Sequence, residues 1–178
     1  VKAGLRFLVE RGAFQRGATR KEDVLDLRGQ GDEMVWHALA TLALCESYAM
    51  TRDKGVHRPA QAALNFLVAG QDTETGGWAT KAYRLPDLTT TAWAATALKS
   101  GQMTYLKVPS ESLRSAFKSL DRFQSADGAF CFCGRTGPDN DPGATAMGLF
   151  CRYRLGWQPD SPVLKRGVAH VAEALPVR

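Results

Sequence analysis

The same helix-turn element occurs twice in this chain, and this repetition constrains the fold more than any other feature. In the first copy, a helical segment at 62–67 is followed by Gln71 and then by Gly76-Gly77-Trp78. In the second, a segment at 116–120 is followed by Gln124 and then by Gly128-Ala129-Phe130. An internal repeat of this length predicts an array of similar units, each of which buries its apolar face against its neighbours.

Two classes of helix alternate along the chain around this element. Amphipathic segments with one apolar stripe lie at 5–8, 64–67, 117–120 and 168–171. Segments rich in Ala, Gly and Thr, apolar on nearly every side, lie between them at 36–44, 91–98 and 144–149. A helix that is apolar all round suits packing on several faces. We therefore expect the second class to be inner helices and the amphipathic class to be outer helices.

This alternation predicts an all-α fold. We expect residues 1–178 to form a single α/α-repeat domain of about three and a half helical hairpins, arranged as an α/α toroid or, if incomplete, as an open arc. The chain begins with Val1 rather than Met, and we expect it to be a fragment of a longer protein. In that case missing chain or a second copy, in a homo-oligomer, completes the toroid.

Proline and glycine residues predict where the helices begin and end. Pro59 and Pro162 are expected at the starts of outer helices, where the fixed φ of proline fits the first turn. Gly55, Gly101 and Gly156 follow the inner helices in the sequence. We expect a left-handed C-terminal cap at each of these glycines.

Composition excludes several classes of protein. Apolar residues make up 44% of the chain, which is enough for a core. The net charge of +5 comes from basic residues interleaved with acids, so we expect no nucleic-acid binding. The longest apolar stretch, 36–50, is interrupted by His37 and Glu46, so we expect no membrane span and a soluble chain. The cell compartment stays open because any upstream signal lies outside the sequence.

The repeated turn is typical of a structural device. A glutamine at a helix end can bond the free carbonyls there, two glycines permit a tight reversal, and Trp78 covers the junction with apolar area. The element resembles the repeat of squalene and terpenoid cyclases and protein prenyltransferase β subunits, which are α/α toroids with a Gln-x-x-x-Gly-x-Trp motif. Gln124, Gly128 and Phe130 match this spacing with Phe in place of Trp, and the copy that begins at Gln71 has one extra residue.

This resemblance implies two kinds of catalytic residue. Squalene-hopene-type cyclases use an acid in an Asp-x-Asp-Asp-Thr-Ala stretch, and the most similar segment here is 139–146, with Asp139 and Asp141 as candidate acids. Prenyltransferases hold zinc with Asp, Cys and His. Cys131 or Cys133 with one of these aspartates imitates two of the ligands, but no matching histidine follows. We predict no cofactor and keep zinc at the two cysteines as an alternative.

Acids also recur where the inner helices are expected to begin, at Asp32, Asp87 and Asp141. An acid at this position is favoured by capping and by the helix dipole, so structure alone explains each one. A second interpretation is that the inner-helix starts share one rim and that these carboxylates converge there on a ligand. The other candidate residues of such a pocket are Trp36, His37, Tyr83, Arg84 and Trp93.

The sequence favours a non-catalytic domain over an enzyme, without deciding between them. Our leading hypothesis is a repeat domain of the cyclase and prenyltransferase type that binds a protein segment or a small apolar ligand on its concave face. The first alternative is an isoprenoid enzyme with Asp139 or Asp141 as acid and Trp36, Trp93 and Phe132 lining its cavity. The second is a glycan-processing or glycan-binding α/α barrel, since such barrels also place acids and tryptophans at inner-helix starts.

Overall fold

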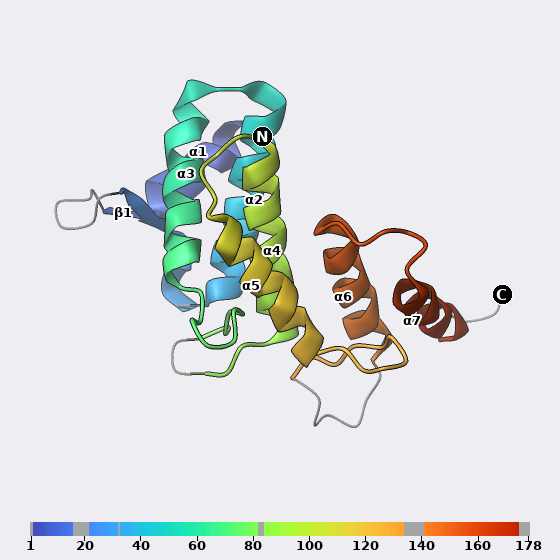
Figure 1. The fold of residues 1–178 in the computed structure, drawn as a ribbon. Helices are drawn as coiled ribbons and strands as arrows, with labels where there is room; N and C mark the ends of the chain where they lie inside the picture. Colours follow the sequence, from blue (N-terminus) through green and yellow to red (C-terminus); the bar gives the residue numbers. More distant parts are fainter. Residues whose placement is uncertain (1, 16–21, 32, 82–83, 134–140, 175–178) are drawn as a thin grey trace.

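The computed structural model describes residues 2–15, 22–31, 33–81, 84–133 and 141–174. These ranges contain seven α-helices and one pair of short strands (Figure 1). The helices are α1 (Lys2–Arg11), α2 (Met34–Thr51), α3 (Lys54–Ala69), α4 (Leu88–Met103), α5 (Ser110–Ser119), α6 (Pro142–Arg154) and α7 (Pro162–Glu173). Two short 3-10 helices, η1 (Gly29–Gly31) and η2 (Leu120–Arg122), lie before α2 and after α5. The predicted all-α class is confirmed.

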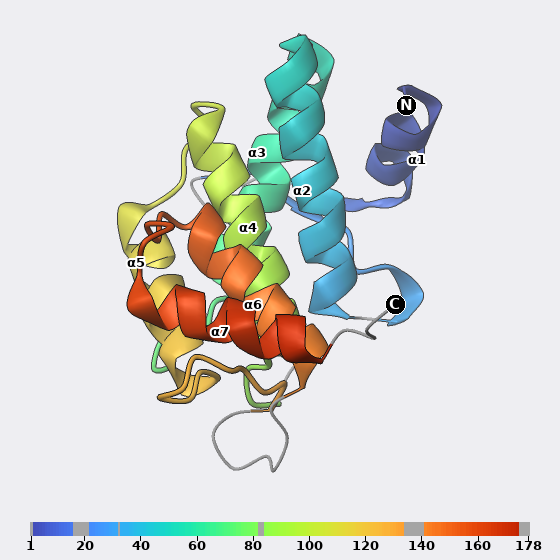
Figure 2. The same ribbon diagram turned by 90° about the vertical axis from the view of Figure 1, so that its right-hand side faces the viewer.

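The helices alternate between an inner and an outer layer, as the sequence predicts. The inner helices α2, α4 and α6 are neighbours, with α4 packed against both of the others. All three run in the same direction, from the bottom of Figure 1 toward its top. The outer helices α3, α5 and α7 each pack on the inner helix that precedes them. Figure 2 shows α1 beside α2 at one end of this arrangement and α7 crossing α6 at the other.

Small side chains let the inner helices approach each other closely. Helix α4 buries residues on nearly every side, including Ala94, Ala95, Ala97 and Leu98. The thiol of Cys151 in α6 lies 3.6 Å from the backbone oxygen of Ala92 in α4. Such close packing maximises dispersion contacts, so truncating a core leucine such as Leu98 is expected to cost about 2–5 kcal/mol of stability.

The repeated turn links successive outer helices. Gln71 donates its side-chain amide to the backbone oxygens of Gly76 (2.8 Å) and of Ser112 in the first turn of α5 (2.9 Å). The carbonyl of Leu67, near the end of α3, accepts the indole N–H of Trp78 at 2.8 Å. The expectation that glutamine bonds its own helix end is therefore wrong for this copy, because the tryptophan does so. In the second copy, the amide of Gln124 lies 3.5 Å from the oxygen of Gly128.

Some predicted boundaries are wrong. Helix α2 ends at Thr51, its C-cap Arg52 has a left-handed φ of 53°, and Gly55 lies in the first turn of α3. Pro59 lies inside α3 rather than before it, and Gly101 is buried within α4. A glycine at this position leaves room for Leu64, because an added Cβ would lie 2.6 Å from the leucine side chain. Gly156, with a φ of 110°, follows α6 as expected.

A β-hairpin lies between α1 and α2, where only connecting chain was expected. Strand β1 (Ala13–Gln15) pairs in antiparallel register with β2 (Val24–Asp26), so that Phe14 is opposite Leu25. Leu25 is fully buried in the core and β2 packs on α3. Strand β2 thus covers one side of α3.

Candidate ligand-binding surface

The inner helices begin at the same point of the repeat. Their N-cap residues are Glu33, Asp87 and Asp141, and both steps between these positions are 54 residues. The carboxylate of Asp87 accepts the backbone N–H groups of Thr90 (2.8 Å) and Thr80 (2.9 Å) and the hydroxyl groups of both threonines. Asp141 accepts the backbone N–H of Ala144 at 2.9 Å. Both aspartates hold helix ends in place, which is the first of the two interpretations above.

Loops from the outer helices cover these helix starts. The backbone oxygen of Thr80, in the loop after α3, accepts the N–H of Met34 at the start of α2 (2.8 Å). In the same way, the oxygen of Phe132, in the loop after α5, accepts the N–H of Leu88 at the start of α4 (3.0 Å). The predicted sharing of one rim by the inner-helix starts agrees with their position on the lower side of Figure 1.

The predicted rim residues lie in different environments. Trp36 is 55% exposed, and its indole N–H donates to the carboxylate of Glu33 at 2.8 Å. Glu33 also pairs with Lys81 at 3.6 Å. Arg84 is exposed and Trp93 is half-buried. Asp32, Tyr83 and Asp139 lie outside the described residues.

His37 lies in the core instead of on the rim. Its side chain is fully buried; Nδ1 accepts the backbone N–H of Leu27 (3.1 Å), and Nε2 lies 3.0 Å from the backbone oxygen of Ala63. These partners define a neutral ring that donates from Nε2, and burial lowers the pKa of His37 to about 4. The same repeat position holds Thr91 and Thr145, whose hydroxyl oxygens accept the N–H groups of Trp78 and Phe130, each at 3.0 Å. His37 is thus the counterpart of two structural threonines.

The cysteines fall into two groups. Cys45 and Cys151 are buried in the inner layer, and burial raises the pKa of each thiol to about 12, so both stay protonated. Cys131 is half-buried with its sulfur 3.5 Å from the oxygen of Phe123, and Cys133 is exposed. Within the described ranges, no group of three or more His, Cys, Asp and Glu residues is arranged to hold a metal ion.

A second surface comes from the inner helices themselves, and the sequence prediction did not single it out. Glu46, Ser100 and Arg154 occupy equivalent positions of α2, α4 and α6, again 54 residues apart. One carboxylate oxygen of Glu46 accepts the hydroxyl of Ser100 at 2.8 Å and lies 3.4 Å from the guanidinium of Arg154. These contacts mark the face on which the three inner helices meet, which we name the inner surface.

Apolar side chains adjoin this polar row on the inner surface. Residues three, four and seven positions apart share one side of a helix. Four residues before the polar row, toward the helix starts, this side carries positions 42, 96 and 150. Seven residues before the row, it carries positions 39, 93 and 147. Five of these positions carry large apolar side chains that are partly exposed, and we name them the apolar band: Leu39, Leu42, Trp93, Met147 and Phe150. The inner surface therefore has an apolar floor with charged groups at one end.

Comparisons with known proteins give little beyond this picture. No protein-family model and no curated protein matches the chain. Among solved structures, it is similar to the GH76 alpha-mannanase of Bacteroides thetaiotaomicron, at 16% sequence identity and a TM-score of 0.49. The match covers 79% of this chain and 42% of that protein. The α/α arrangement of the helices described above defines the fold. None of the helices in the described ranges is long and apolar enough to cross a membrane.

Proposed function

We propose that this chain is an α/α-repeat domain that binds a small apolar ligand with a polar end on its inner surface. The observation that carries the proposal is the apolar band, which lies beside the polar row of Glu46, Ser100 and Arg154. Removing exposed apolar area from water contributes roughly 25 cal/mol per Å². A ligand that covers the band gains this contribution, while Arg154 or Glu46 fixes the orientation of its polar end.

The resemblance of the repeated turn to that of cyclases and prenyltransferases supports the choice of ligand class. Those families handle isoprenoid chains inside α/α toroids, and an isoprenoid alcohol has the apolar body and polar end that the inner surface fits. Farnesol is therefore the first probe. A protein segment with an apolar helix face is the other occupant that this surface suits, and the test below separates the two.

Both enzymatic alternatives depend on a carboxylate at the rim. The carboxylate of Asp87 is occupied by four hydrogen bonds from Thr80 and Thr90. Asp141 caps α6 through Ala144, and Asp139 lies outside the described residues. We therefore place ligand binding before the isoprenoid-enzyme hypothesis, for which Asp139 and Asp141 stay the candidate acids, and before the glycan hypothesis.

Tryptophan fluorescence tests the proposal directly. Farnesol and dodecanol are expected to change the emission of Trp93 in a saturable way, and Trp93→Phe is expected to remove most of that change. Trp93→Ala is expected to weaken binding, measured by isothermal titration calorimetry, about tenfold, which corresponds to about 1.4 kcal/mol. Tyr105→Ala serves as the matched control, because Tyr105 is 87% exposed and lies outside the inner surface.

Two results would count against the proposal. If neither alcohol binds with saturation, or if Trp93→Ala binds as tightly as the parent chain, the inner surface is not the ligand site. Saturable binding of maltohexaose without binding of either alcohol would favour the glycan alternative. Binding of an amphipathic helical peptide without binding of the alcohols would favour a protein segment.

A further inference from the structure

The second helical hairpin, α4 with α5, holds a pocket of about 260 Å³ beside the end of α6. Its lining combines apolar with polar and charged side chains: Leu113, Phe117, Leu155, Lys99, Gln102 and Arg114. We name it the inter-hairpin pocket. Since α2 and α6 flank α4 on its two sides, this pocket lies inside the array rather than at one of its ends.

The first hairpin, α2 with α3, fills the equivalent place completely. The inner helices repeat after 54 residues and the outer helices α3 and α5 after 53, as the glutamines of the repeated turn do. The counterparts of Lys99, Leu113, Phe117 and Leu155 are therefore Cys45, Ala60, Leu64 and Gly101. The first three counterparts are fully buried, and a Cβ added to Gly101 would lie 2.6 Å from the side chain of Leu64. A larger residue replaces both members of this contact in the second hairpin, and a pocket stays open beside them.

Lys99 introduces a charge at a position that belongs to the core in the first hairpin. Lysine is rarely placed at such a position, because burial of its ammonium group is costly. The side chain is half-buried, and Nζ donates to Oε1 of Gln102 at 2.9 Å. This partner is neutral, so the positive charge of Lys99 has no acidic partner among the described residues.

Two arginines add positive charge around the same pocket. Arg114 pairs with Glu111, one turn earlier in α5, but both side chains are more than half exposed, so water weakens this ion pair. Arg152 lies behind the ring of Phe117, with its guanidinium 4.6 Å from the ring centroid, and donates to the backbone oxygen of Phe117 at 3.0 Å. Asp121, the acid that pairs with Arg152, is 68% exposed. The wall formed by Phe117 is therefore held in place by a cation.

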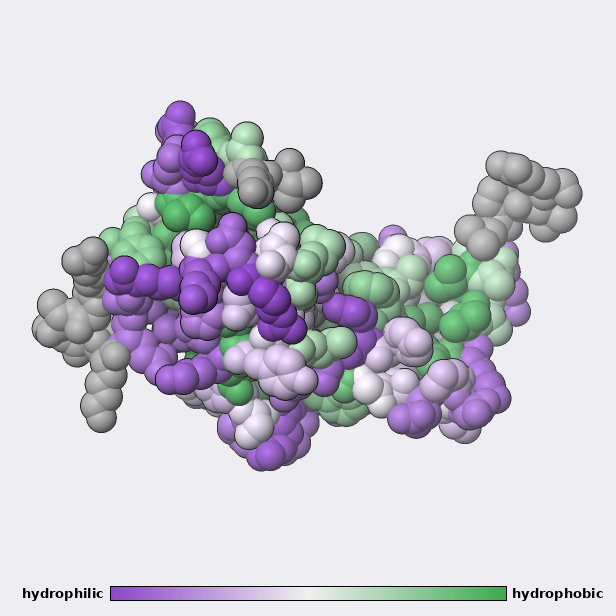
Figure 3. Space-filling model, turned by 90° about the horizontal axis from the view of Figure 1, so that it is seen from above, coloured by the Kyte–Doolittle hydropathy of each residue, from purple (hydrophilic) through white to green (hydrophobic). Residues whose placement is uncertain are grey.

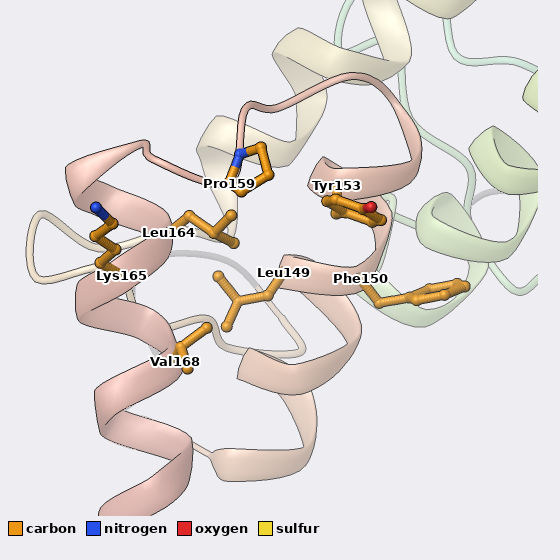
Figure 4. A pocket seen from close by; sticks show the side chains of 7 residues that line it. All are labelled: Leu149, Phe150, Tyr153, Pro159, Leu164, Lys165 and Val168. Atoms are coloured by element: carbon orange, nitrogen blue, oxygen red, sulfur yellow. The ribbon is translucent and has the colours of Figure 1, made fainter.

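The third hairpin, α6 with α7, has an apolar pocket of about 520 Å³ in the equivalent place (Figure 4). Tyr153 occupies the position of Lys99 there. The cation of this pocket, Lys165, donates to the carboxylate of Asp160 at 3.0 Å. Figure 3 shows hydrophobic surface gathered at this end of the molecule. Of the three hairpins, the second alone therefore combines the pocket with a lysine at this position.

We propose that the inter-hairpin pocket binds a small anion with an apolar body, an aromatic carboxylate or phosphate ester. The apolar body covers Leu113, Phe117 and Leu155, which removes their exposed area from water. The anionic head group accepts charge-assisted hydrogen bonds from Lys99 and Arg114. This pocket lies between hairpins and not on the inner surface, so the proposal stands independently of the ligand proposed above.

Isothermal titration calorimetry with four probes tests the proposal. Naphthoate and naphthyl phosphate, substituted at the same ring carbon, carry the apolar body and an anionic head group. Naphthol keeps the body without the charge, and acetate keeps the charge without the body. We expect saturable binding of the naphthyl anions, about tenfold weaker binding of naphthol and no binding of acetate. The tighter of the two anions identifies the head group as carboxylate or phosphate.

A pair of lysine variants assigns the binding to this pocket. Lys99→Met keeps the length of the side chain but removes its charge, and is expected to weaken naphthoate binding about tenfold. Lys118→Met is the matched control, because Lys118 is exposed on α5 and is not among the residues that line the pocket. Far-ultraviolet circular dichroism checks that both variants fold. Naphthol binding as tightly as naphthoate, no saturation by either anion, or equal naphthoate affinities of the two variants would each overturn the proposal.

Discussion

His37 shows how one buried side chain couples folding to pH. The protein interior keeps the imidazole neutral, because its two nitrogens already bond Leu27 and Ala63 and because burial opposes a charge. Thr41 and Phe66 lie against the ring as well, at 3.2 Å and at a centroid distance of 4.7 Å. The unfolded chain, by contrast, exposes the ring to water, where it binds a proton near its ordinary pKa of 6.5.

The expected result is a loss of stability in acid. Below pH 6.5 the imidazole of His37 binds a proton in the unfolded chain but not in the folded chain. The free energy of unfolding therefore falls as pH falls, down to the folded pKa of about 4. Over this interval the loss amounts to about 3 kcal/mol. His37→Gln, whose amide oxygen can still accept the N–H of Leu27, is expected to lower stability at pH 7 and to remove this part of the pH dependence.

Urea unfolding of both chains between pH 4.5 and 7.5 measures the effect. The difference between parent and variant isolates His37 from the carboxyl groups that also titrate in acid. Equal slopes for the two chains would mean that the pKa of His37 is the same in the folded and the unfolded chain. His57→Gln is the control, since His57 lies outside the core, and it is expected to preserve the slope of the parent chain.

At the scale of the elements, the turns between outer and inner helices depend on glycine at one position. Gly76 has a φ of 75°, and a Cβ there would lie 2.5 Å from the backbone oxygen of Ser115 in α5. Gly128 repeats this arrangement against α7, with a φ of 94° and a distance of 2.6 Å to the oxygen of Val163. The glycine therefore allows the turn of one hairpin to touch the outer helix of the next.

Gly76→Ala is expected to lower the free energy of unfolding by about 2 kcal/mol or more, because the cost of a left-handed backbone and the cost of the steric clash add together. Gly29→Ala is the matched control: Gly29 has a φ of 70°, but no atom lies within 4 Å of the added Cβ. Gly29→Ala is expected to lower the free energy of unfolding by about 1 kcal/mol, because only the cost of the left-handed backbone conformation applies there. Chemical denaturation measures both, and equal losses would show that contact with α5 contributes nothing.

Arg152 connects three elements near the end of α6. Its side chain is fully buried; it donates to the backbone oxygen of Phe117 in α5 (3.0 Å) and to the side-chain oxygen of Gln124 (3.1 Å), and it pairs with Asp121 in η2. The guanidinium also lies over the ring of Trp157 at 4.8 Å. It therefore bonds a carbonyl near the end of α5 from a neighbouring hairpin.

Arg152→Met is expected to lower the free energy of unfolding by about 3–5 kcal/mol, because it leaves the buried oxygens of Phe117 and Gln124 without a donor. Asp121→Asn is expected to cost less than about 1 kcal/mol, since the Asp121 side chain is 68% exposed. Thermal or urea unfolding of the two variants separates the contribution of the hydrogen bonds of Arg152 from that of its ion pair with Asp121. A loss from Asp121→Asn as large as that from Arg152→Met would assign the stabilisation to the ion pair instead.

The whole molecule is an array in which each hairpin packs mainly on its neighbours. Helix α4 is flanked on both sides, by α2 and α6, and also contacts α3 and α5, whereas α1 and α7 each lie at an end. Stability in such an array is highest where neighbours exist on both sides. We therefore expect amide hydrogen exchange to be slowest in α4 and fastest in α1 and α7.

Exchange followed by mass spectrometry checks this order. Uniform protection from α1 to α7 would contradict an array of locally stabilised hairpins.

The sequence predicts the alternation of inner and outer helices because composition differs between the two classes. It does not predict the β-hairpin at β1 and β2, because the first copy of the repeat lacks the glutamine that marks the turn elsewhere. The equivalence of His37 with Thr91 and Thr145 is not visible in the sequence either. Histidine and threonine look unlike in sequence, and only the matching hydrogen bonds to Leu27, Trp78 and Phe130 show that they are equivalent.

The candidate site was predicted less well than the fold. Acids at inner-helix starts suggest a rim pocket, yet helix capping accounts for the contacts of Asp87 and for the bond that Asp141 accepts. The apolar band was missed apart from Trp93, since half-exposed residues of an inner helix have the same composition as fully buried ones. Only the pairing of Glu46 with Arg154 shows which side of each helix faces inward.

Because Glu33, Asp87 and Asp141 are equally spaced, the stretch of chain from one to the next is a unit that recombination between related genes can add or remove. Each of these residues is the last one before an inner helix, so a break after any of them falls at the same point of the repeat. A chain without residues 88–141 would join Asp87 directly to Pro142, and α6 would keep an aspartate as its N-cap. Recombination after Asp87 or Asp141 would therefore change the number of hairpins in a lineage while the junction keeps an aspartate cap.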